Sequence, residues 1–571
     1  MSISRICAAC DVRLLESYDR NSIMEITREK FSFPTRNYPY RQAVPGVEDA
    51  IDDAPALEPG KVYRFVLGLD RIPRAMTDDE VSGLLRDPFA EIFFKRGVFP
   101  LSLRSLLAGL DEAAGPLALP GQKVFLIADG GQIPWSDQTD ELNRLLRFAV
   151  IRAKGNDARL LVSSSSIFDG EGEGAFLQVI GWDEENKVFN YYERRRGVWF
   201  WAGNSLHALE PETRGRGPFD SHVNGSLVMK ELRAPWHNWH SQAVSIRDNV
   251  LAPGDPLRNE PVFKGRTGAE ELELFVRAGI RRWNQARFAH FTSADGVTLE
   301  KVPYLMRQVL ETTTVNLTTS QQQSRQITGT AQLRLPTTFF INLEAFEKEI
   351  GLELDLSVIQ VNGKFYRDSL QKYEFTLSDG SFSTRGDSFF AFLVPEPAFE
   401  DLSVLSILLE KRLIGRRFAA SLLMVDFQNP VFSRRRRDLM KYVADSASLN
   451  TAGEIASNIE EVFVAAVEAV EASLPAGSPE SEFLANWRLP DDAWKPGFES
   501  RITAYFEKLA ETAATESGFD GWVRLAESRR REFRGRRLAE FRLTTPTTNI
   551  PDSAPLLEMT LGGGVIEKSI N

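Results

Sequence analysis

The hydrophobic pattern of this chain changes its period from one end to the other. Up to residue 201, apolar residues gather in short runs of strand length, whereas from Glu400 onward they recur at helical spacing over long segments. A chain of 571 residues is also too long for one ordinary hydrophobic core. We therefore expect a multidomain α+β or mixed α/β fold, divided into residues 1–255 (mixed α/β), 256–398 (α+β) and 399–571 (mainly helical).

A βαβ unit is predicted in the first of these parts. Val124–Ala128 and Ala158–Val162 are apolar enough for buried strands, and residues 140–151 between them favour a helix. In open parallel sheets, ligands bind beyond the carboxyl ends of the strands. Asp129–Gly131 and Ser163–Ser166 would occupy that position.

An aromatic antiparallel meander is predicted over Phe176–Trp182, Val188–Tyr192 and Gly197–Trp201. Further along, residues 312–326 are rich in Thr, Ser and Gln and predict a loop. Asn362-Gly363 predicts a type I′ hairpin.

Helices are expected to begin at the capping boxes Thr77–Glu80 and Thr267–Glu270. Beyond residue 400 the strongest helical segments are Leu402–Leu413, Gly453–Leu474, Phe498–Thr515 and Trp522–Phe541.

Four of the chain's five histidines lie between residues 207 and 240, close to half of its ten tryptophans. The densest part is the run Pro235-Trp236-His237-Asn238-Trp239-His240. If Pro235 opens a helix, His237 and His240 share one face of it. Imidazole is the commonest metal ligand and titrates near neutral pH. The cluster is therefore the predicted functional site.

A metal site is the first chemistry that fits the cluster. His237 and His240 would be ligands, with His222 as a third and Asp220 or Glu231 completing the set. Two histidines and one carboxylate are typical of non-haem iron, and zinc is the other candidate metal.

Haem and metal-free catalysis are the alternatives at the same place. An axial histidine would hold haem, with Trp236, Trp239 and His207 around the cofactor. Without a metal, His222 with Asp220, or a histidine with Asp129, would act as acid and base. The same residues also fit plain packing at a domain interface.

Two arginine-rich runs, Arg434–Arg437 and Arg529–Arg537, contrast with the acidic character of the chain. The guanidinium fork binds carboxylates and phosphates bidentately, so both runs suit an anionic partner. A solvated face paired with neighbouring acidic residues is the commoner explanation of such runs.

The whole-chain properties exclude some classes of function. A formal net charge of −11 argues against general nucleic-acid binding. No apolar run reaches the ~20 residues that span a bilayer, and the N-terminus lacks a signal-peptide pattern. Cys7 and Cys10 are the only cysteines, so a disulfide framework is excluded, and a redox or ligand role for them is not required. A cytoplasmic protein is expected.

No P-loop, G-x-S-x-G or H-E-x-x-H motif is present. The histidine cluster therefore carries the functional expectation. It predicts a metal- or haem-dependent oxidoreductase that acts on a small or carrier-linked aromatic metabolite. The alternative is a non-catalytic binding or assembly protein that contacts a partner through its aromatic patch and arginine-rich helices.

Overall fold

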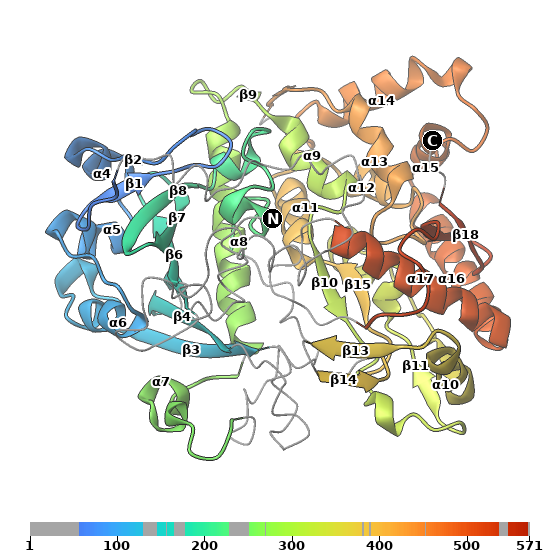
Figure 1. Cartoon of the computed structure of the whole chain (residues 1–571). Helices are drawn as coiled ribbons and strands as arrows, with labels where there is room; N and C mark the ends of the chain where they lie inside the picture. The colour runs from blue at the N-terminus through green and yellow to red at the C-terminus, as the bar shows by residue number, and fades with distance from the viewer. Residues whose placement is uncertain are drawn as a thin grey trace. The chain divides into compact units, whose positions relative to one another are not determined.

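The computed structural model describes residues 56–128, 146–155, 157–164, 177–227, 251–268, 270–379, 382–387, 390–450, 453–535 and 546–568. They form two compact units, coloured mainly blue to green and green to red in Figure 1. Unit 1 consists mainly of the described residues up to Leu227 and of residues 251–279. Unit 2 consists of residues 280–533 and 546–568. The boundary lies inside helix α8 (Glu270–Phe291). The division into three domains stays a prediction.

Unit 1 is built on an eight-stranded sheet with the order β2-β1-β8-β7-β6-β5-β4-β3. Neighbouring strands are antiparallel except β1 and β8, which are parallel, so the sheet is mixed. The predicted aromatic meander is confirmed as β6, β7 and β8. The strands are β1 (Val62–Arg64), β2 (Arg74–Ala75), β3 (Gly121–Ala128), β4 (Leu146–Lys154), β5 (Asp157–Ser164), β6 (Leu177–Asp183), β7 (Val188–Arg195) and β8 (Val198–Asn204).

The predicted βαβ unit is wrong. Residues 146–151, expected to be helical, begin strand β4, which pairs antiparallel with both β3 and β5. Phe148, Val150 and Ile151 are aromatic or β-branched and are fully buried, which favours a central strand over a helix. Ser163 and Ser164 consequently do not lie at the carboxyl edge of a parallel sheet. Asp129–Gly131 lie outside the described residues.

Short helices cover the sheet of unit 1. The capping box at Thr77 is confirmed: it starts α4 (Asp78–Leu84), and the Glu80 N–H donates to the Thr77 hydroxyl at 3.2 Å. Helix α5 (Pro88–Ile92) packs on the sheet, where the Phe89 ring lies 4.9 Å from that of Trp199. The remaining helices are α6 (Leu103–Asp111) and α7 (Pro261–Lys264). Helix α8 follows the second capping box and begins at Glu270.

Unit 2 is mainly helical, as the pattern beyond residue 400 predicts. Its helices are α9 (Val302–Leu310), α10 (Gly363–Lys372), α11 (Phe399–Glu410), α12 (Arg416–Leu423), α13 (Arg434–Arg437), α14 (Ile459–Glu468), α15 (Pro479–Trp487), α16 (Trp494–Ala513) and α17 (Glu516–Gly535). Five two-stranded ladders accompany them: β9 (Thr298–Leu299) with β16 (Ala447–Ser448), β10 (Val315–Thr318) with β15 (Val394–Pro397), β11 (Gln332–Arg334) with β12 (Gln360–Asn362), β13 (Thr376–Asp379) with β14 (Phe382–Arg385), and β17 (Leu557–Met559) with β18 (Val565–Glu567).

Two local predictions in unit 2 are wrong. Asn362-Gly363 makes no hairpin, because the Asn362 side chain accepts the Lys364 N–H at 2.8 Å and caps helix α10. The predicted loop of residues 312–326 contains the buried strand β10. The polar residues just before this strand find a partner in the fold, because the Asp401 carboxylate accepts the Thr313 N–H at 3.1 Å. Among the described helices, none is long and apolar enough to cross a membrane.

Candidate functional site

Most of the predicted histidine site lies outside the residues that the structure describes. His237, His240, Trp236, Trp239 and Glu231 all lie outside the described residues, as do Cys7, Cys10 and Asp129. Only His207, His222 and Asp220 are described, all in the segment that follows β8 in unit 1.

The described members of the cluster make local contacts. His207 Nδ1 lies 2.8 Å from the Asn204 side-chain oxygen, and its ring meets Trp201 edge-on at 5.4 Å. Burial lowers the pKa of His207 to about 4, so the ring is neutral at pH 7. His222 Nδ1 lies 2.8 Å from the Ser226 carbonyl oxygen, and Asp220 is buried. These contacts orient the two rings within unit 1.

The nearby tryptophans are core residues of the sheet. Their indole N–H groups donate to protein acceptors: Trp182 to Glu184 at 2.8 Å, Trp199 to the Pro100 carbonyl at 2.9 Å and Trp201 to Asn190 at 3.0 Å. All three side chains are buried. They therefore pack the core of unit 1.

No group of three or more His, Cys, Asp or Glu side chains in the described ranges is arranged to hold a metal ion. Because His237, His240 and Glu231 are not among those residues, the metal and haem assignments stay predictions.

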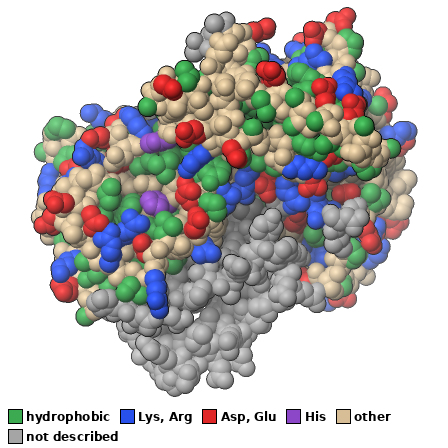
Figure 2. All heavy atoms as spheres, turned by 90° about the horizontal axis from the view of Figure 1, so that it is seen from above, with side chains coloured by type: hydrophobic (Ala, Val, Ile, Leu, Met, Phe, Trp, Pro, Cys, Tyr) green, Lys and Arg blue, Asp and Glu red, His purple; other side chains and the backbone are tan. Residues whose placement is uncertain are grey.

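The arginine-rich runs are partly internal. Arg436 is buried, and so are Arg529, Arg530 and Arg531. Arg435 and Arg437 are half-buried and pair with Glu482 and Asp438, as expected of a solvated face. Arg536 and Arg537 lie outside the described residues. On the part of the surface that Figure 2 shows in colour, positive and negative side chains are interspersed and form no field of one sign.

The two runs approach each other at a chain reversal, residues 426–433. Asp426 starts it with a positive φ of 55°, and Phe432 near its end has a φ of 61°. Such backbone is uncommon for residues other than glycine and clusters at functional sites. Ser433 then caps α13, since its hydroxyl accepts the Arg436 N–H at 3.1 Å.

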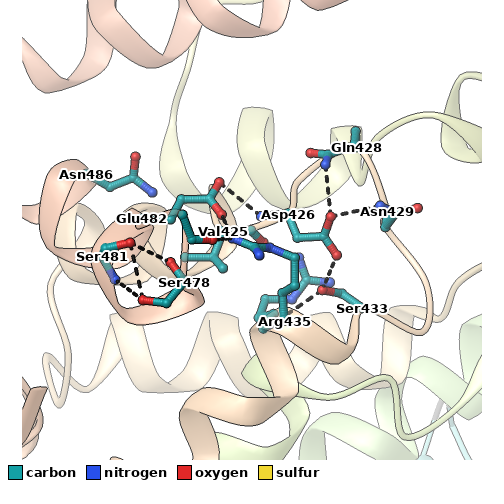
Figure 3. A network of polar contacts seen from close by, with 12 residues as sticks. Val425, Asp426, Gln428, Asn429, Ser433, Arg435, Ser478, Ser481, Glu482 and Asn486 are labelled. Carbon is teal, nitrogen blue, oxygen red and sulfur yellow. Dashed lines mark hydrogen bonds and ion pairs between the residues drawn. The ribbon is translucent and has the colours of Figure 1, made fainter. Parts of the chain in front are cut away.

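The Asp426 carboxylate organises this reversal (Figure 3). One oxygen accepts the side-chain amides of Gln428 at 2.9 Å and Asn429 at 2.8 Å. The other accepts the Ser433 hydroxyl at 2.6 Å. The Asp426 N–H donates to the Glu482 carboxylate of α15 at 3.3 Å. Arg435 pairs with this Glu482 carboxylate at 2.9 Å.

A small polar pocket opens beside the reversal, and we call it the Asp426 pocket. It encloses about 230 Å³ of empty space, part of which is open to solvent. Its walls come from residues 426–433, from α17 and from the C-terminal hairpin β17–β18 with the residue after it. The lining residues are Asp426, Asn429, Val431, Phe432, Ser433, Arg529, Glu532, Leu557, Glu558 and Lys568.

Direct contacts hold the cations of this pocket. Lys568 Nζ donates to the Phe432 carbonyl at 2.8 Å and pairs with Glu532 at 2.9 Å. Arg529 donates to the Phe339 carbonyl at 2.5 Å and lies 4.6 Å above the Phe339 ring. Both side chains are buried, so their positive charges stand close to the pocket with little water around them.

Burial shifts the pKa of the charged groups in the Asp426 pocket. It raises the pKa of Asp426, against the opposing effect of Ser433, Asn429 and Arg436. It also raises the pKa of Glu558, and the charge of Asp426 adds to that rise. Burial lowers the pKa of Arg529 to about 10, at which the guanidinium keeps its charge at neutral pH. A cleft whose titratable groups are perturbed in this way is a functional candidate.

The sequence contained part of the signal for this pocket. Arg529 belongs to the second arginine-rich run, and the first run directly follows the reversal that carries Asp426. Glu558 and Lys568 had no local signal, because they reach the pocket only when the C-terminal hairpin packs against α17. Comparisons with protein-family models, with curated proteins and with solved structures give no match.

Proposed function

We propose that this protein binds a compact anion in the Asp426 pocket of unit 2. The observation that carries the proposal is that two buried cations, Arg529 and Lys568, line one pocket together with the hydrogen-bonding side chains of Asn429 and Ser433. The proposal draws on the anionic partner that the sequence suggests for the two arginine-rich runs. It differs from the predicted assembly protein, which would contact a partner chain through its aromatic patch and arginine-rich helices.

The charges that line the pocket are mixed. Two cations, Arg529 and Lys568, stand beside three carboxyl groups, Asp426, Glu532 and Glu558. Lys568 pairs with Glu532 at 2.9 Å. Arg529 therefore supplies attraction for an anion, and Asp426 and Glu558 restrict which anion the pocket accepts.

The size of the pocket limits the ligand. Its most enclosed part has room for about one water molecule. A compact oxyanion that enters from the open side and stays partly hydrated suits this shape.

Calorimetric titration of inorganic phosphate into the full chain, at low ionic strength and pH 7, tests the proposal. Saturable binding is expected, and Lys568→Met should weaken it by about tenfold, since one buried charge beside the ligand is lost. Lys372→Met is the matched control, because Lys372 pairs with Asp520 at 2.6 Å on the surface and away from the pocket lining.

Thermal unfolding of both variants would show that each is folded. A chain that takes up no phosphate, or a Lys568→Met variant that binds it as tightly as the unmodified protein, would contradict the proposal.

The oxidoreductase remains a separate proposal from the sequence. It depends on His237 and His240, with His222, Asp220 or Glu231 beside them, and an aromatic metabolite as substrate. The cytoplasmic location likewise stays a prediction.

A further inference from the structure

Two carboxyl groups share the Asp426 pocket with its cations. Asp426 and Glu558 both line it, in addition to the Glu532 carboxylate that pairs with Lys568. An ionised carboxylate repels an anion at the same place, and the repulsion is strong where little water is present. An anion can nevertheless contact a carboxylate if a proton lies between the two oxygens, because the contact is then a hydrogen bond.

Resting on the proposed function, we propose that the Asp426 pocket selects an oxyanion that carries its own proton, and so binds phosphate in preference to sulfate. Inorganic phosphate at neutral pH carries at least one P–O–H group, whereas sulfate carries none. The cations Arg529 and Lys568 attract both ions. The carboxylate of Glu558 or Asp426 accepts the phosphate hydroxyl and repels an oxygen of sulfate.

The hydrogen-bonding capacity of Asp426 fits this role. A carboxylate offers about four acceptor positions. Gln428, Asn429 and Ser433 donate to the two oxygens of Asp426, and the described contacts leave acceptor capacity for a further donor from the pocket. Glu558 also lines the pocket, from strand β17.

The charged and titratable groups that act on these two carboxyls come from every surrounding element. For Asp426 they are Arg436 of α13, Glu482 of α15, Tyr505 of α16, Arg529 of α17 and Glu558 of β17. For Glu558 they are Asp426, Lys568, Arg435 and Arg434. Each set contains positive and negative groups. Each of the two carboxyl groups is therefore attracted by nearby cations and repelled by the other carboxyl group.

The two ions therefore differ in their use of protons. Phosphate supplies the bridging hydrogen from its own O–H group, so that bond stays intact and no proton is taken up from solvent. Sulfate needs a proton from solvent on Asp426 or Glu558 before the contact becomes favourable. Sulfate binding should consequently take up a proton and strengthen toward acid pH.

Competitive titration of sodium phosphate and sodium sulfate into the full chain, at pH 7.5 and equal ionic strength, tests this inference. Phosphate is expected to bind at least about tenfold more tightly, which corresponds to about 1.4 kcal/mol. In Glu558→Gln the carboxylate is replaced by an amide that can donate to sulfate, so the ratio of the two affinities should fall toward unity.

Glu567→Gln is the matched control, because Glu567 lies on β18 of the same hairpin, is exposed and does not line the pocket. Asp426→Asn tests the second carboxylate in the same way. Equal affinities in the unmodified protein, or a ratio that neither Glu558→Gln nor Asp426→Asn changes, would overturn the selectivity while leaving anion binding intact. Binding of neither ion would overturn the proposed function itself.

Discussion

Arg529, Arg530 and Arg531 follow one another on α17, and each makes a different internal contact. Arg529 donates to the Phe339 carbonyl, Arg530 donates to the Leu393 carbonyl at 2.8 Å, and Arg531 donates to the Ala554 carbonyl at 2.7 Å. A guanidinium carries five N–H donors on a long stem, so backbone carbonyls can satisfy it inside a fold. At the scale of the residue, these arginines connect α17 to segments that are distant in sequence.

Asn429 has a comparable role and carries a prediction. Its side-chain oxygen accepts the Met559 N–H at 2.9 Å and its amide donates to the Met559 carbonyl at 3.0 Å, while the side chain is buried. Asn429→Ala should lower the free energy of unfolding by roughly 3 kcal/mol, because buried backbone groups lose their partners. Urea unfolding measures the change.

The exposed Asn549, whose amide donates to the Lys372 carbonyl at 3.1 Å, provides the comparison. Asn549→Ala should cost less than about 1 kcal/mol. Equal losses in the two variants would mean that the Asn429 bonds do not hold the C-terminal hairpin.

At the scale of the element, side chains next to a turn decide between two local structures. Asn-Gly is a strong hairpin signal, but an asparagine is equally suited to cap a helix. In this chain Asn362 ends β12 and caps α10, and Gly363 becomes the first residue of the helix. The antiparallel pairing of β12 with β11 shows why: its partner strand precedes it, so no returning strand is needed after Asn362.

Replacement of this cap gives an element-scale prediction. Asn362→Ala should lower the free energy of unfolding by about 1 kcal/mol, since the Lys364 N–H loses its acceptor. Asn362→Asp retains a capping oxygen and should stay close to the unmodified protein. Thermal unfolding of the two variants side by side measures the difference, and an alanine variant as stable as the aspartate variant would contradict the capping role.

At the scale of the whole molecule, buried carboxyl groups make stability depend on pH. Burial raises the pKa of Asp87 in unit 1, and of Asp387 and Asp401 in unit 2, to about 6, from an ordinary value of 3.8. A carboxyl group whose pKa is raised in the folded state adds to the free energy of unfolding. The contribution is complete at a pH below the pKa of the unfolded state and is lost as the pH rises through 6. His207, whose pKa is lowered to about 4, has the opposite effect. Its contribution to the stability of the protein is lost as the pH falls below 6.5.

Asp387→Asn separates these contributions. The substitution keeps an oxygen for the Tyr366 hydroxyl, 3.4 Å from Asp387, and removes the ionisation. Between pH 7.5 and 5.0 the unmodified protein should gain about 1 kcal/mol relative to this variant, because only its Asp387 takes up a proton. Unfolding curves at the two pH values measure the gain, with the exposed Asp78→Asn as control. Parallel pH profiles of Asp387→Asn and the unmodified protein would contradict the assignment.

The sequence by itself determined the features that depend on neighbours along the chain. The aromatic strands β6, β7 and β8, the cap at Thr77 and the helical C-terminal part are all visible locally, because strand composition, helical period and cap geometry involve only nearby residues. The tertiary structure alone decided that residues 146–151 form a central strand and that Arg436 and Arg529–Arg531 are buried. It also assembled the Asp426 pocket, since Asp426, Arg529, Glu558 and Lys568 meet only when a reversal, a helix and a hairpin pack together. Burial then sets the charges of those groups, and burial is a property of the packed fold that no stretch of sequence contains.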